Sequence, residues 1–337
     1  MRRHILFVIT YVVLLNISTG CKDKDSLPEL FILDQVSPDS IFVENSAYIA
    51  VIGDIQEYTN SNELLYYLVQ TNNWLRWQQE YFGVFSCVLQ NGDLTEYNSK
   101  EQWSRVDFSL NYLGNDLIFI PSTGNHDYTW GSKENPVEIA DRNTTKLNSL
   151  KNLKYLRNLN LVYFEKNKLD NIIVPIEIGN RIVNIISLEF GPRKEVIEWV
   201  SQIVKNNKSQ KYILMTHEWL TLDGERIDSC GFADLQFPRL SHTNPEEIWQ
   251  KLVFPNDNIL CVLCGHNGFC KYLFSENKFG RNVGQILFNL QYQENGGDGM
   301  IQLWEFPNDK NEINISVYNT ITRQFHPDPT TRITIKL

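Results

Sequence analysis

Apolar runs rich in β-branched and aromatic residues recur along this chain, and five of them end directly in a polar cluster. These runs occupy residues 48–52, 84–89, 117–121, 212–215 and 259–263. Their length and composition predict buried β-strands. Segments with apolar positions at helical spacing lie between or beside them, at residues 63–82, 99–112, 196–204 and 245–253. The alternation of strands and helices predicts an α/β fold.

The chain changes character from Arg281 onward. Strand-like runs follow one another there, separated only by turn residues, at residues 283–289, 300–306, 313–318 and 331–335. Strands without intervening helices favour a second sheet packed on the first. Asn267 and Gly268 form a turn signal, which predicts a hairpin that joins residues 259–264 to residues 269–274.

The first twenty residues have the order of an export signal. Arg2 and Arg3 precede an apolar stretch at residues 5–15, which is too short to span a membrane comfortably. Small residues and then Cys21 follow, which resembles the cleavage site of bacterial lipoproteins, where this cysteine is lipidated. We therefore expect an exported protein, anchored in the membrane of a bacterial envelope through a lipid on Cys21. An ordinary secretory peptide is the alternative.

Four segments divide the chain on these grounds. Residues 1–20 form the signal peptide, residues 21–46 a tether, residues 47–325 one domain and residues 326–337 a C-terminal strand. With 337 residues the chain can bury one large core or two ordinary ones, and no boundary signal splits the main domain. Residues 130–171 are polar and rich in Asn and Lys, and we expect them to lie over the crevice described below.

The composition and net charge of the chain limit the classes of molecule that it is expected to bind. The chain is 42% hydrophobic and 21% charged, which is typical of a globular protein, and its net charge is −9. No dense stripe of Lys and Arg is visible, so nucleic acid is disfavoured as a partner, because binding to its backbone needs clustered cations. A small phosphorylated substrate remains compatible with this charge, since a metal ion can supply positive charge locally.

The polar clusters after the five apolar runs share one kind of chemistry. Their candidate residues are Asp54, Gln56, Asp93, Asn125, His126, Asp127, His217 and His266. Groups at the carboxyl ends of strands in an α/β sheet converge on one crevice. Carboxylates, imidazoles and carboxamides are ligands that suit divalent cations. The pattern therefore predicts a metal site.

In this order the clusters resemble the motifs of the calcineurin-like metallophosphoesterases, over roughly residues 48–318. The most specific motif is Gly124-Asn125-His126-Asp127. The resemblance implies a two-sheet α/β/β/α sandwich with the site at one edge. It also implies two divalent metal ions and hydrolysis of a phosphate mono- or diester by a metal-bound hydroxide.

The resemblance assigns the metal ligands residue by residue. Four residues would hold the second metal: Asp93, Asn125, His217 and His266. Asp93 would bridge to the first metal, which Asp54 and Gln56 would also face. Singly, each residue has a structural alternative, since Asn125 could cap a helix and His217 could be a satisfied core histidine.

Two further residues receive catalytic roles from the resemblance. His126 would protonate the leaving oxygen or hold the phosphoryl group, and Asp127 would fix the His126 ring. The substrate would be a phosphorylated small molecule or a lipid headgroup.

Two departures from the family pattern fall on the first metal. Gln56 and Gly268 stand where the family usually has histidines. We therefore expect the second metal to bind tightly and the first to bind weakly and exchange. The ligands left at the first site are oxygen atoms, which favour Mn²⁺, Mg²⁺ or Ca²⁺ over Zn²⁺. Asn289 and Gln291 are auxiliary candidates to replace the missing ligands. The identity of the metal stays open among Mn, Fe, Zn, Mg and Ca.

The same departures support an alternative function. The chain could be a catalytically degenerate, exported binding protein that retains one metal. Retention of His126 and Asp127 argues against this alternative, because such residues serve turnover rather than structure.

Overall fold

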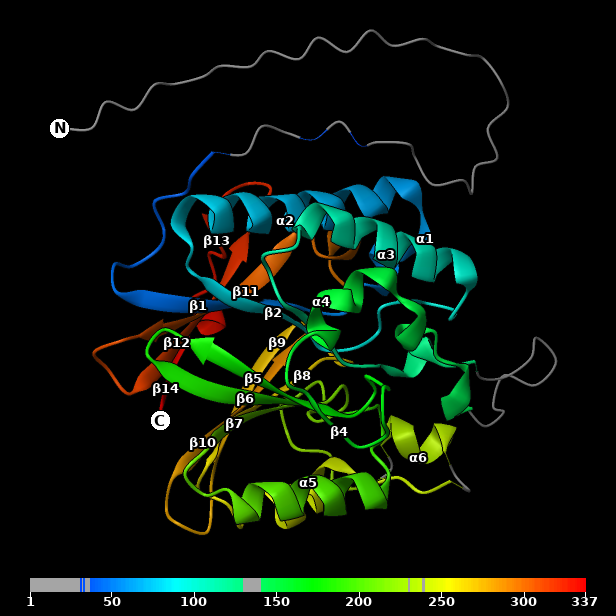
Figure 1. Ribbon diagram of the computed structural model, residues 1–337, viewed down its shortest axis with the longest axis vertical. Helices are drawn as coiled ribbons and strands as arrows, with labels where there is room; N and C mark the ends of the chain where they lie inside the picture. Colours follow the sequence, from blue (N-terminus) through cyan, green and yellow to red (C-terminus); the bar gives the residue numbers. More distant parts are fainter. Residues whose placement is uncertain (1–30, 32, 34–36, 130–140, 230, 238–239) are drawn as a thin grey trace, which may run out of the picture.

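The computed structural model describes residues 31, 33, 37–129, 141–229, 231–237 and 240–337 (Figure 1). The expected export signal and the lipidation site Cys21 lie outside the described residues. Within the described ranges, no helix combines the length and the apolar character that a membrane crossing requires.

Two stacked β-sheets form the centre of the fold (Figure 1). The first sheet has the order β13-β12-β11-β1-β2-β3, with β14 paired to β12. Its strands are β1 (Ser46–Ile52), β2 (Phe85–Gln90), β3 (Phe119–Pro121), β11 (Met300–Pro307), β12 (Glu312–Asn319), β13 (Gln324–Phe325) and β14 (Ile333–Lys336). The second sheet has the order β4-β5-β6-β7-β8-β10-β9. Its strands are β4 (Val162–Tyr163), β5 (Ile172–Ile178), β6 (Arg181–Ser187), β7 (Lys211–Met215), β8 (Ile259–Cys264), β9 (Cys270–Glu276) and β10 (Asn282–Phe288).

Helices cover the outer faces of both sheets (Figure 1). The first sheet carries α1 (Gln56–Asn60), α2 (Asn62–Phe82) and α3 (Lys100–Leu113). The second carries α5 (Lys194–Asn206) and α7 (Pro245–Ile248), which continues as a π-helical turn over Trp249–Val253. The short helices α4 (Lys154–Arg157) and α6 (Phe232–Gln236) lie in the connections. The predicted α/β/β/α sandwich is therefore confirmed.

Side-chain alternation along the strands builds two cores. In β7, Ile213 and Met215 belong to the core between the sheets, whereas Tyr212 and Leu214 belong to the core beneath α5. Successive side chains of a strand point to opposite faces, so a strand that is apolar at every position is buried on both faces. This explains why the apolar runs of the sequence are continuous.

All of the predicted strands and all four predicted helices are present, but two predictions about pairing were wrong. The expected hairpin between β8 and β9 does not form, because β10 lies between them, parallel to β8 and antiparallel to β9. The last strands do not make a second sheet of their own. Instead β11 pairs with the open side of β1 and extends the first sheet, because a strand as buried as β1 needs a hydrogen-bonding neighbour on each side.

Polar side chains tie the two sheets together at the edge where their parallel strands end. Asn91, which directly follows β2, donates from Nδ2 to the carbonyl oxygens of Cys264 (2.7 Å) and Phe288 (2.8 Å). Both acceptors are the last residues of strands in the other sheet. Ser122 Oγ adds a third connection, to the Leu188 oxygen at 2.7 Å. These contacts hold the carboxyl ends of both sheets against each other.

We expect Asn91→Leu to destabilise the chain strongly, because it leaves two buried carbonyls without donors. Each unsatisfied buried group costs about 1–3 kcal/mol, so the free energy of unfolding should fall by roughly 2–5 kcal/mol in urea denaturation. The matched control is Asn115→Leu at an exposed position, for which a change within about 0.5 kcal/mol is expected. Equal stability of both variants would contradict the structural role of Asn91.

Candidate metal centre

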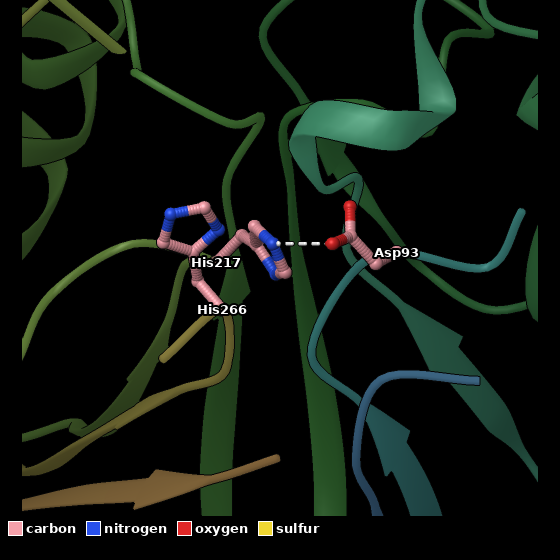
Figure 2. A group of neighbouring side chains, drawn as sticks. All are labelled: Asp93, His217 and His266. Carbon is pink, nitrogen blue, oxygen red and sulfur yellow. Dashed lines mark ion pairs between the residues drawn. The ribbon is translucent and has the colours of Figure 1, made fainter. Parts of the chain in front are cut away.

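Four predicted ligands meet at the edge where the sheets join. Asp93 follows β2, Asn125 follows β3, His217 follows β7 and His266 follows β8. His217 Nε2 lies 3.1 Å from Asp93 Oδ2 and 3.1 Å from Asn125 Oδ1, and His266 Nδ1 lies 2.8 Å from Asn125 Oδ1. Figure 2 shows the carboxylate of Asp93 and the two imidazoles facing one another.

The donor set fits a divalent cation. A cation with bonds of about 2.1 Å holds neighbouring ligand atoms roughly 3 Å apart, which is the separation found here. The ring nitrogens of His217 and His266 both converge on Asn125 Oδ1, so two imidazoles, an amide oxygen and the Asp93 carboxylate surround one point that a cation could occupy.

The backbone oxygen of Asn91 sets the ring orientation of His217. Its Nδ1 lies 2.9 Å from the backbone oxygen of Asn91, an arrangement in which Nδ1 carries the proton and donates it. This leaves Nε2, the atom that faces Asp93, available as a ligand. Asn91 therefore serves twice, since its side chain joins the sheets and its carbonyl orients a metal ligand. Asn91 was not among the residues predicted for the site from the sequence.

Backbone conformation brings the ligands this close. Asp93 and His266 have φ angles of 52° and 70°, a left-handed region that costs non-glycine residues about 1–3 kcal/mol. Two glycines allow the close approach of carboxylates: a Cβ on Gly124 would lie 2.1 Å from Asp93 Oδ1, and one on Gly265 would lie 2.2 Å from Asp54 Oδ1. Any larger residue at these two positions would displace a carboxylate.

Burial and neighbouring charges shift the pKa values of the carboxylate and the two imidazoles in the centre. Burial raises the pKa of Asp93, but the nearby imidazoles of His217 and His126 outweigh it and hold this pKa well below its ordinary value. Burial lowers the pKa of His217, but Asp93 and Asp54 outweigh it and raise this pKa to about 10. For His266, burial and then the charge of His217 lower the pKa to about 3. Asp93 and His217 thus form a buried ion pair, in which a proton provides the positive charge that a metal would otherwise supply.

The first-metal position is poorer in ligands. Burial raises the pKa of Asp54 to about 8, a shift that the charge of His217 opposes and the charge of Asp93 reinforces. Gln56 donates from Nε2 to Asp93 Oδ2 (3.2 Å) and to Gln291 Oε1, while Gln56 Oε1 is buried without a partner among the described residues. The amides of Gln56 and Gln291 therefore form a pair on this side of Asp93.

The two auxiliary candidates differ in their positions. Gln291 reaches the centre, where it contacts Gln56 and donates to the backbone oxygen of His266 at 3.3 Å. Asn289 is buried beneath it and accepts the backbone N–H of Gln291 through Oδ1 at 2.9 Å. In the part of the chain that the structure describes, the Nδ2 of Asn289 has no hydrogen-bond partner.

His126 lies beside the ligands, at the margin of the centre. Its backbone N–H donates to Asp93 Oδ1 at 2.9 Å, and its side chain is 22% exposed, unlike the fully buried His217. Burial lowers the pKa of His126, but the carboxylates of Asp93 and Glu96 outweigh it and raise this pKa above its ordinary value. The ring is therefore both accessible and able to carry a proton.

The predicted contact between Asp127 and the His126 ring was wrong. Asp127 instead accepts the backbone N–H groups of Gly124 (2.9 Å), Leu94 (3.1 Å) and Thr95 (2.9 Å), and so fixes the loop that carries Asp93. The His126 ring faces Glu96, with Nδ1 2.9 Å from its backbone oxygen and 3.6 Å from its carboxylate. The sequence contains no signal for Glu96, because it lies in an ordinary loop between β2 and α3.

Comparison with known proteins agrees with this geometry. A model of the calcineurin-like phosphoesterase family matches residues 47–270. A curated relative, the uncharacterized protein YvnB of Bacillus subtilis (strain 168), is 23% identical over 306 residues, an alignment that covers 88% of this chain and 21% of YvnB. The chain thus spans about a fifth of the length of that relative.

Solved structures that match this chain are distant in sequence. A 5′-nucleotidase precursor from Thermus thermophilus is 11% identical, with 87% of this chain and 54% of that chain covered and a TM-score of 0.41. A conserved uncharacterized protein from Streptococcus pneumoniae TIGR4, described as a predicted phosphoesterase, is 11% identical, with 88% and 100% covered and a TM-score of 0.33.

The family match covers residues 47–270, more than half of the 337 residues. The chain therefore belongs to the calcineurin-like phosphoesterase family, whose members use divalent metals in the hydrolysis of phosphoesters.

Proposed function

We propose that this chain hydrolyses phosphate mono- or diesters with a divalent cation held by Asp93, Asn125, His217 and His266. The observation that carries the proposal is the convergence of these four ligands next to a partly exposed histidine, His126. A binding protein would need the ligands but would not need a proton donor at the margin of the centre.

The cation, when bound, supplies an activated water nucleophile near neutral pH and neutralises charge on the phosphoryl oxygens. The residues of the chain supply the remaining functions. Asn91 and Asn125 orient the imidazole of His217, and the amide pair of Gln56 and Gln291 closes the side next to Asp54. His126 holds a proton that it can transfer to the leaving oxygen, and Glu96 keeps its ring in position.

A cavity beside His266 offers room for the organic part of the ester. It has a volume of about 460 Å³, and its lining includes Leu222, Phe232 and Leu235. Leu222 and Leu235 are 61% and 59% exposed, so the cavity opens to solvent. We propose that the substrate is a phosphorylated small molecule or a lipid headgroup whose organic group occupies this cavity.

We expect His126→Gln to slow hydrolysis in a way that depends on the leaving group. A positioned general acid contributes roughly 10²- to 10⁴-fold, but only where the leaving oxygen needs a proton. The measurement is kcat/KM for a series of aryl phosphate esters with phenols of increasing pKa. The loss caused by the variant should grow along the series, with little loss for p-nitrophenyl esters.

Two further measurements make this test decisive. The control His326→Gln, at a histidine outside the metal centre, should show the same kcat/KM as the unmodified chain across the series. If His126→Gln lost activity equally for every ester and also had a much lower Tm, His126 would have a structural role and the proposed proton transfer would be wrong.

The number of tightly held ions should be one. The second-metal site has four converging ligands, whereas the first has two carboxylates and an amide pair. Loss of a residue that only hydrogen-bonds to a ligand already weakens metal affinity by about 10–100-fold, so the loss of direct ligands should weaken the first site at least as much. After dialysis, metal analysis by mass spectrometry should find one ion per chain, and Gln56→His should increase retention of a second ion. The matched control, Gln250→His at an exposed position, should change nothing. Two equally retained ions in the unmodified chain would refute the proposal.

A second candidate function rests on the amide pair. Because Gln56 donates a hydrogen bond to Asp93 rather than presenting an imidazole, the first-metal position could have lost its role in turnover. The chain would then be a degenerate binding protein that retains one metal. The His126→Gln variant distinguishes the two candidate functions. A binding protein would show no turnover in the unmodified chain, and it would bind phosphate or phosphate ester equally well with and without the substitution.

A further inference from the structure

A second distinctive surface lies at the end of the second sheet that is opposite the metal centre. Here β7 and β8 begin, α5 ends, and the turn between β9 and β10 reaches the surface; Figure 1 draws this region at its lower left, beside α5. Two adjoining cavities of about 840 and 510 Å³ follow this end and share Asp257 and Phe279 as lining residues.

The lining of the two cavities is strongly cationic. Seven cationic side chains line them, which together we call the basic rim: Arg181, Lys205, Lys208, Lys211, Lys251, Lys278 and Arg281. The acidic side chains of the same lining are Glu198 and Asp257. Seven cations against two acids give a local excess of five positive charges in a chain whose net charge is −9.

The positive charge of the basic rim is available to a partner. All five lysines are exposed. Across the described residues, only Lys251 of these lysines has an acidic group within ion-pair distance, Glu247 at 3.6 Å. Arg181 and Arg281 donate to backbone carbonyl oxygens, of Pro307 (3.0 Å) and Leu260 (3.2 Å) respectively, and so keep their charge while their positions are fixed.

Apolar side chains stand among these cations. Phe279, at the tip of the turn between β9 and β10, is 58% exposed, and Ile182, at the start of β6, is 69% exposed. Phe279 is flanked in sequence by Lys278 and, after Gly280, by Arg281. An exposed aromatic residue between cations is the pattern of surfaces that insert apolar groups at the boundary of a lipid layer while cations contact the headgroups.

We propose that the basic rim docks the protein on an anionic lipid surface. Each Lys or Arg near such a surface contributes attraction, and the insertion of Phe279 and Ile182 adds apolar burial. Because the rest of the chain is acidic, its field turns the basic rim toward a negatively charged surface.

The orientation that results leaves the metal centre free. Lys211 begins β7 and His217 follows its carboxyl end, six residues further on, a separation of roughly 20 Å at about 3.3 Å per residue. A surface in contact with the basic rim therefore faces away from the metal centre. A lipid headgroup of that same surface would not reach the centre, and substrate would arrive from the opposite side. The proposal does not depend on the proposed hydrolysis.

The experiment is co-sedimentation of the full chain with vesicles of phosphatidylcholine alone and of phosphatidylcholine with phosphatidylglycerol. The test variant combines Lys205→Gln, Lys208→Gln and Lys278→Gln, and a second variant is Phe279→Ala. The matched control replaces three exposed lysines elsewhere, Lys100→Gln, Lys151→Gln and Lys166→Gln. All variants share the same N-terminal residues, so any contribution of these residues to vesicle binding is equal in every sample.

The proposal predicts that the triple rim variant loses at least about tenfold in affinity for the anionic vesicles, while the control variant retains its affinity. Phe279→Ala should also weaken binding to anionic vesicles, and raised salt should weaken binding of the unmodified chain but not of the rim variant. Equal losses in the rim and control variants would overturn the proposal. So would tight binding to a soluble polyanion such as heparin, unaffected by Phe279→Ala, combined with no preference for anionic vesicles.

Discussion

The contact of the two sheets at their carboxyl ends is the constraint on which the rest of the structure depends. Asn91 makes this contact with two hydrogen bonds from one amide, to the last residues of β8 and β10. Its backbone oxygen then orients His217, so the joint between the sheets and the orientation of a metal ligand belong to one residue. The other candidate ligands come from loops at the same edge, and Asp127 fixes the loop that carries Asp93.

The side chains that gather at this joint offer several possible metal-ligand atoms close together. Asp93 and His266 adopt left-handed backbone conformations, and Gly124 leaves space beside the Asp93 carboxylate. The cost of these conformations, about 1–3 kcal/mol each, must be offset by the surrounding structure. On the side of His217 and His266, the side chains form a possible metal-binding group with Asp93. On the side of Asp54, the amides of Gln56 and Gln291 bind each other instead. The two sides of the centre therefore differ in their side-chain chemistry.

Much of the fold and of the centre could be predicted from the sequence because both depend on local patterns. Continuous apolar runs identify buried strands, and polar residues directly after them identify the edge where ligands gather. The hairpin of β5 and β6 also has a local signal in the sequence, Gly179-Asn180 between apolar runs. The insertion of β10 between β8 and β9 had no such signal, because strand pairing is decided by burial over the whole sheet.

Residues that act through tertiary proximity could not be predicted. Glu96 becomes the neighbour of His126 only after the loop before α3 folds back over the centre, and Asp127, adjacent in sequence, turns to the backbone of Leu94. The basic rim was missed for the same reason. Its cations are spread over residues 181–281 and form no stripe in the sequence, yet strand starts and one helix end bring them together.

The most direct test of the central claim is hydrolysis of bis-p-nitrophenyl phosphate by the purified chain with added Mn²⁺, compared with Asp93→Asn. The account predicts turnover that requires the metal and falls by more than about a hundredfold in the variant. Asp93 is proposed as a direct ligand, and loss of a residue that only hydrogen-bonds to a ligand already costs about 10–100-fold in metal affinity. Turnover that is unchanged by Asp93→Asn, or that persists after the metal is removed, would contradict the account.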